Sequence, residues 1–208
     1  QTGEQNMRSV MPAQHDFSKV PQINNIQRSV FNRSHGHKST FDVNQLVPVL
    51  VDEILPGDTV DLRMNVFARL SQALDFPIMD NMHLDTFFFF VPNRIVWENW
   101  EKFMGAKEPN DTTDYVIPTL ADPTSSFNNG SIFDYMGLVP NVYSEGTEQF
   151  SALPFRAYNK IYNEWFRDEN LQTSINEPID DGPDGISNYN VELRGKRQIG
   201  RASCRERV

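Results

Sequence analysis

Residues Leu84–Trp100 read "LDTFFFFVPNRIVWENW", and this stretch carries two structural signals in succession. The first is the run of four phenylalanines, Phe87–Phe90, which is stopped by Pro92. Successive side chains of a strand point to opposite faces, so an all-aromatic strand must be covered on both faces. The run is also far shorter than the roughly 18 apolar residues of a membrane span. We therefore predict a strand over Leu84–Val91 that is covered on both faces.

The second signal follows the proline. Asn93 is a residue type that often caps the start of a helix, and Gly105 fits its end. Between them, Trp97 and Trp100 stand three residues apart, on one face of a helix. The pattern predicts one helix over residues 94–105 that turns both tryptophans inward.

Further strands are predicted from the segments that precede this stretch. Residues 40–55 are rich in β-branched and apolar residues, and Pro48 indicates an edge strand or a break there. Pro56 and Gly57 suit a tight turn. After the turn, apolar and polar residues alternate, which predicts a strand with one buried face; its apolar members are Val60, Leu62, Met64 and Val66.

The second half predicts helices set among long loops. We expect a short strand at Tyr115–Ile117 and a short helix at Ser131–Met136. A longer helix begins near Pro154, a residue favoured in the first turn. Its aromatic stripe predicts a core-facing side that holds Phe155, Tyr158, Ile161, Tyr162, Trp165 and Phe166, with Arg156, Lys160, Glu164 and Arg167 mostly off it. The chain is thus predicted to be mainly β, with inserted helices.

Composition excludes several classes of protein. The formal net charge is −9, which argues against a nucleic-acid-binding domain as a whole, although local basic patches remain possible. One cysteine, Cys204, permits no intrachain disulfide. The N-terminal residues show no apolar signal-peptide pattern.

Three regions are predicted along the chain. Residues 1–39 are polar and without periodicity, so they are expected to form an extended N-terminal arm. Residues 40–197 form the folded domain. Residues 198–208, "QIGRASCRERV", coincide with a translated reading frame of a short-read sequencing adapter, so we expect them to be an adapter artefact. On this interpretation the natural chain continues past Arg197, and its start is Met7 or Met11.

No residue set points to catalysis, a cofactor or a metal. His35 and His37 have no carboxylate or cysteine at ligand spacing and are expected to be exposed arm residues, and His15 and His83 are isolated. The acidic pairs are interpreted as solvated charge; they are Asp52–Glu53, Asp180–Asp181 and Glu164 with Asp168. Residues 180–185, "DDGPDG", lack the closing glutamate of a calcium loop and are interpreted as a turn. Residues 194–197, "RGKR", could touch phosphate but are weak support for such a site. We expect no enzyme.

Four segments taken together resemble one protein family. They are "FSKVPQINNIQRSVFNRSHGHKSTFD" (residues 17–42), "LVPVLVDEILPGDTVDLRMNVFARL" (46–70), "PIMDNMHLDTFFFFVPNRIVWENWEKFMG" (77–105) and "ALPFRAYNKIYNEWFRDENLQ" (152–172). In this order they closely resemble the major capsid protein of microviruses, the gokushovirus branch in particular, which are small icosahedral phages with single-stranded circular DNA. In that family "RGKR" continues directly into an aromatic segment that does not follow it here.

The resemblance implies an antiparallel eight-stranded viral jelly roll with large loop insertions, of which residues 40–197 hold only part. It implies a structural protein that assembles with copies of itself and other virion proteins into a shell around single-stranded DNA, in the bacterial host cytoplasm, and no membrane partner. The arm would line the inner wall or clasp a neighbour. The alternatives are a jelly-roll carbohydrate-binding module or glycosidase-like domain, which needs exposed sheet aromatics or a carboxylate pair in a cleft, and a DNA-binding protein, which needs positive charge.

Overall fold

The structure is a computed structural model that describes residues 28–43, 45–70, 79, 81–121, 128–139 and 149–189. The chain divides into two units, residues 1–36 and 37–208. In the first unit the described residues 28–36 are extended and exposed. Local contacts order this segment, and the Nδ1 atom of His35 lies 2.9 Å from the carbonyl oxygen of Arg33.

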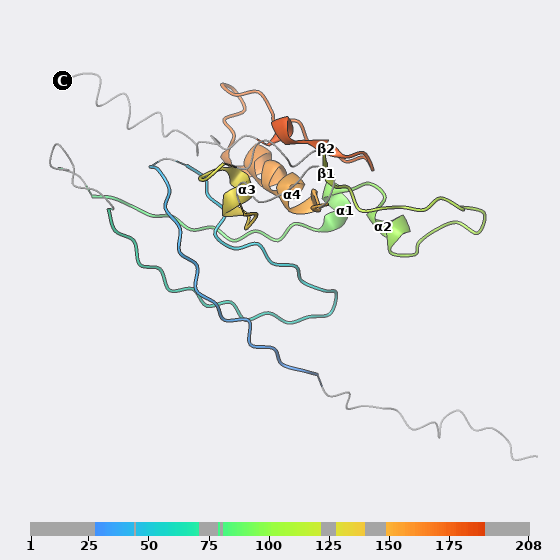
Figure 1. The fold of residues 1–208 in the computed structure, drawn as a ribbon, viewed down its shortest axis with the longest axis horizontal. Helices are drawn as coiled ribbons and strands as arrows, with labels where there is room; N and C mark the ends of the chain where they lie inside the picture. Colours follow the sequence, from blue (N-terminus) through green and yellow to red (C-terminus); the bar gives the residue numbers. More distant parts are fainter. Residues whose placement is uncertain are drawn as a thin grey trace, which may run out of the picture. The chain divides into compact units, whose positions relative to one another are not determined.

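Helix α4, Leu153–Ile161, organises the second unit (Figure 1) and continues directly into a π-helical turn, η2, Tyr162–Phe166. Pro154 lies in its first turn, where its missing N–H leaves no helical hydrogen bond unmade. The predicted long helix is therefore confirmed, with its last turn widened.

Two hydrophobic clusters pack against the start of α4. The larger contains Phe155 from α4, and its other buried members are Leu120, Ile132, Phe133, Ala152 and Tyr189. The smaller contains Leu153 from α4 with Val96 and Trp97. Because Leu153 and Phe155 lie on different sides of the helix, α4 separates the two clusters.

A short parallel pair of strands lies beside α4 (Figure 1). Strand β1, Leu120–Ala121, pairs with β2, Asp184–Gly185, in the register Leu120↔Asp184. Thr119 also forms an antiparallel bridge with Ser151. The strand predicted at Tyr115–Ile117 is thus displaced by a few residues toward the C-terminus. After β2 the chain forms a short 3-10 turn, η3, Ile186–Asn188.

Helix α3, Ile132–Tyr135, is defined at both ends by its sequence and confirms the predicted short helix. The Ser131 hydroxyl accepts a hydrogen bond from the Asp134 N–H at 3.4 Å, and the Asp134 carboxylate accepts one from the Gly130 N–H at 2.8 Å. Gly137, with φ of 99°, ends the helix, because the N–H of Leu138 reaches back to the Phe133 carbonyl at 2.9 Å.

The single helix predicted over residues 94–105 is wrong. The structure has two one-turn helices, α1 over Asn93–Val96 and α2 over Trp100–Phe103. Pro92, and not Asn93, occupies the N-cap of α1, and Trp97 between the helices is extended, with φ −147° and ψ 118°. Gly105, with φ of 106°, ends α2 as predicted.

The segments predicted as strands before α1 are extended in the structure, with no assigned strand over residues 46–70 and 81–91. Their alternating apolar side chains are exposed: Val60 by 56%, Leu62 by 49% and Val66 by 55%. A strand needs a partner strand for its backbone hydrogen bonds, and the described residues provide none for these segments. The eight-stranded jelly roll therefore stays a prediction.

Candidate functional site

Arg156 is the most deeply buried charged residue among those that the structure describes, with a side chain only 1% exposed. Its Nε and Nη2 atoms each donate a hydrogen bond of 2.7 Å to the two carboxylate oxygens of Asp184, which is 2% exposed. This bidentate geometry is the strong form of an arginine–carboxylate pair. The sequence pattern placed Arg156 off the core-facing stripe, and that prediction is wrong.

Tyr189 completes this buried group. Its hydroxyl donates a hydrogen bond to Asp184, while its ring packs on Phe133 and Phe155. Burial, together with the hydrogen bond to Asp184, raises the pKa of Tyr189 far above its usual value of 10.0. Burial opposes the charge of Arg156, but the bonds to Asp184 outweigh it and raise the pKa of the guanidinium. Arg156 and Asp184 therefore form a charged pair that is enclosed by core side chains.

A second contact joins the same loop to the break between α1 and α2. The Trp97 indole N–H and the Asn99 amide both donate to the carboxylate of Asp181. The backbone N–H of Glu98 donates to the Ile179 carbonyl oxygen at 3.0 Å. These bonds hold Trp97 extended and fully buried, which explains why the helical pattern is interrupted at this residue.

Polar side chains of α4 and η2 also bind the segment that follows η2. Asn163 donates to the Ile175 carbonyl at 2.9 Å and accepts from the Ile175 N–H at 3.0 Å, so its amide mimics a strand partner. Lys160 pairs with Glu164 at 2.9 Å and with Glu177 at 3.2 Å. The hydrogen bond between Lys160 and Glu164 raises the pKa of the lysine and lowers that of the glutamate.

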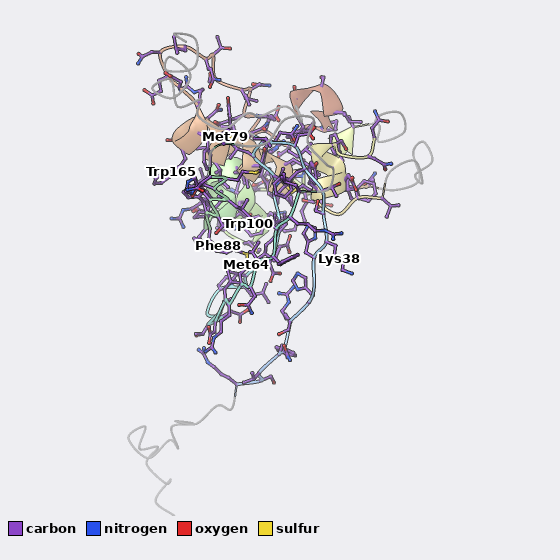
Figure 2. All side chains as sticks on the ribbon, turned by 90° about the vertical axis from the view of Figure 1, so that its left-hand side faces the viewer. Lys38, Met64, Met79, Phe88, Trp100 and Trp165 are labelled. Carbon is purple, nitrogen blue, oxygen red and sulfur yellow. The ribbon has the colours of Figure 1, made fainter. Side chains whose placement is uncertain are left out.

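An aromatic cluster joins the phenylalanine run to η2. Phe87 contacts Phe166 edge-on, with ring centroids 5.6 Å apart, and Phe89 contacts Trp165 and Phe166 at 5.6 and 5.9 Å. The alternate residues, Phe88 and Phe90, are 54% and 75% exposed. Figure 2 labels Phe88 and Trp165 on these two segments. We call Phe88 and Phe90 the outer face of the run. The opposite face has ring contacts but is only partly covered, because Phe87 is itself 61% exposed and Phe89 is half-buried.

The candidate residues from the sequence do not converge on a catalytic or metal site. His35 and His37 are exposed and belong to different units, and His83 is exposed as well. Within the described ranges, no group of three or more His, Cys, Asp or Glu side chains could hold a metal ion. His15 and residues 194–197 lie outside the described residues.

The acidic pairs have structural roles or face solvent. Asp52 and Glu53 are exposed, and Glu164 pairs with Lys160. Asp180 and Asp181, interpreted from the sequence as solvated, contact Arg156 and Trp97 respectively. The "DDGPDG" segment, predicted as a turn, bends over residues 180–182 and ends in strand β2, and its carboxylates have partners. The sequence did hold a signal for a polar face on α4 and η2 that binds other segments. Beside the aromatic stripe, polar residues recur at helical spacing: Arg156, Asn159 and Asn163.

Comparison with known proteins identifies the family to which these features belong. Residues 18–203 match the capsid protein (F protein) family. The chain belongs to this family. Over 179 residues it is 49% identical to capsid protein VP1 of Bdellovibrio phage phiMH2K, an alignment that covers 86% of this chain and 33% of that protein. It is 48% identical over 166 residues to capsid protein VP1 of Chlamydia phage 1, covering 76% of this chain and 27% of that protein.

A more distant relative is capsid protein VP1 of Spiroplasma virus 4, 32% identical over 194 residues, with 89% of this chain and 34% of that protein covered. The chain thus spans about a third of the length of the curated relatives it matches. The predicted resemblance to microvirus capsid proteins is confirmed. A capsid protein is a structural protein, so the prediction that the chain is not an enzyme is confirmed as well. Among the described helices, none has the length and apolar character of a membrane span.

Proposed function

We propose that this chain is part of a major capsid protein that assembles with copies of itself into a small icosahedral phage shell. In the complete protein, residues 40–197 would contribute strands to an antiparallel eight-stranded jelly roll, with α1–α4 as insertions between strands. The observation that carries this proposal is the exposure of apolar side chains along extended segments in a member of a capsid family. Such segments need partner strands, which are supplied by the rest of a complete protein or by a neighbouring copy.

The content of the shell and its place of assembly are part of the same proposal. The shell would enclose single-stranded DNA, include other virion proteins and form in the cytoplasm of the bacterial host. The acidic net charge of −9 means that contact with DNA would rest on local basic residues such as Arg28, Arg33 and Lys38 of the arm. Single-stranded DNA that co-purifies with particles from phage-producing cells and resists nuclease supports this part; particles from such cells that hold no nuclease-resistant DNA contradict it.

Replacing both outer-face residues, Phe88→Ser with Phe90→Ser, is expected to act in opposite directions in two forms of the protein. In the 208-residue chain these rings are exposed, so their removal should raise the soluble fraction after expression. In the complete protein the same rings would be covered by the jelly roll. There the double substitution should lower the free energy of unfolding by several kcal/mol, because each large-to-small core change costs about 3–5 kcal/mol.

The matched control is Phe89→Ser, whose half-buried ring packs on Trp165 and Phe166 within this chain. It should destabilise both forms. If the outer-face pair leaves the stability of the complete protein unchanged, those rings are not covered by the proposed barrel.

A further inference from the structure

The guanidinium of Arg156 is surrounded by oxygen atoms that match all of its hydrogen-bond donors. Arginine carries five N–H groups in a planar fork. Beyond the two bonds to Asp184, the Nη1 atom donates to the carbonyl oxygens of Val96 at 3.2 Å and Asp180 at 2.9 Å. The Nη2 atom donates to the Gly182 carbonyl at 3.4 Å. Each donor therefore has its own acceptor.

Most of these acceptors come from one short loop. Asp180, Gly182 and Asp184 occupy alternate positions, and their carbonyl and carboxylate oxygens converge on the same group. Backbone carbonyls and carboxylates that converge from a short loop are the usual means by which proteins bind a cation. In this chain the cation is a side chain from helix α4.

The outer part of the loop covers Trp97. The Ile179 carbonyl oxygen accepts a hydrogen bond from the Glu98 N–H, and the Asp181 carboxylate accepts one from the Trp97 indole N–H. We call residues 179–184 the strap. Because the strap contacts Arg156 on one side and residues 97–99 on the other, its conformation couples α4 to the break between α1 and α2.

We propose that the strap folds around the Arg156 guanidinium as around a bound cation, and that this internal cation site holds the strap closed over Trp97. Arg156 is then a positioning residue for the strap. A lysine would not replace it, because an ammonium group has three donors and lacks the planar fork. The inference is independent of the proposed shell, since it concerns contacts within one chain.

Chemical rescue tests the cation site. In the complete protein, Arg156→Ala should reduce the hydrogen-exchange protection of two reporter amides by about tenfold or more, the factor that corresponds to a loss of ~1.4 kcal/mol. The reporters are Glu98, bonded to Ile179, and Asp184, whose N–H donates to the Thr119 carbonyl at 2.9 Å. Guanidinium chloride far below denaturing concentrations should restore protection, whereas ammonium chloride at equal ionic strength should not.

Two further variants keep the test decisive if the alanine variant fails to fold. Arg156→Lys keeps the charge and most of the volume, and it should lose protection of Glu98 without rescue by guanidinium, because the lysine fills the site. Arg63→Ala is the control, because Arg63 is 86% exposed and pairs with the exposed Asp61 two residues away; protection should be unchanged. Full protection in Arg156→Lys, or equal rescue of Arg156→Ala by ammonium, would overturn the proposal.

Discussion

Replacing Asp184 by alanine is expected to lower the free energy of unfolding of the complete protein by about 3–5 kcal/mol, the usual cost of breaking a buried ion pair. The substitution leaves the Arg156 charge buried at 1% exposure without its carboxylate. It also removes the acceptor of the Tyr189 hydroxyl. Urea unfolding followed by tryptophan fluorescence measures the loss, and a reduced midpoint with an unchanged slope would assign it to stability.

The matched control is Asp180→Ala. This carboxylate is 76% exposed and lies 3.6 Å from the Arg156 Nη2 atom, so its removal should cost about 0–1 kcal/mol. The backbone carbonyl of Asp180, which accepts from Arg156, is retained in this variant. If Asp180→Ala and Asp184→Ala lower the free energy of unfolding equally, the burial of an Arg156–carboxylate pair does not determine how much that pair stabilises the protein.

Trp97→Ala is expected to have an effect of similar size, about 3–5 kcal/mol, because it empties the centre of the smaller hydrophobic cluster. Trp97 is fully buried, and its ring contacts Trp100 and Phe103 at centroid distances of 6.0 and 5.3 Å. The substitution also frees the Asp181 carboxylate from the indole N–H. Thermal unfolding monitored by circular dichroism provides the measurement.

Trp165→Ala provides the comparison for Trp97. Trp165 is 63% exposed, and its described ring contact is with Phe89, so its loss should cost about 0.5–1.5 kcal/mol. A loss at Trp165 as large as that at Trp97 would mean that Trp165 is covered in the complete protein by residues outside this chain.

The helices that could be predicted from the sequence are those whose limits are set by local chemistry. Pro154 in the first turn of α4, and Ser131 with Asp134 and Gly137 at the two ends of α3, all act within a few residues. The residues that form these ends lie beside one another in the sequence, so pattern alone places them.

The features that escaped prediction depend on partners distant in the sequence. The extended conformation of Trp97 is set by Asp181, and the burial of Arg156 is set by Asp184. Helical spacing indicates which residues share a helix face. It cannot show that a distant loop with carboxylates will cover a face that carries a charged residue. The segments predicted as strands before α1 have no assigned strand for a related reason. An alternating pattern specifies which side chains share a face, but the backbone hydrogen bonds of a strand require a partner strand.

Electron microscopy of the complete protein would show whether this chain is part of a capsid protein that assembles with copies of itself. The complete protein would be expressed alone and purified at several salt concentrations, since interfaces between exposed charges are weakened by salt. We expect closed isometric particles, in whose density the Phe88 and Phe90 rings are covered within a β-barrel. Unassembled monomers under every salt condition would contradict the proposed assembly.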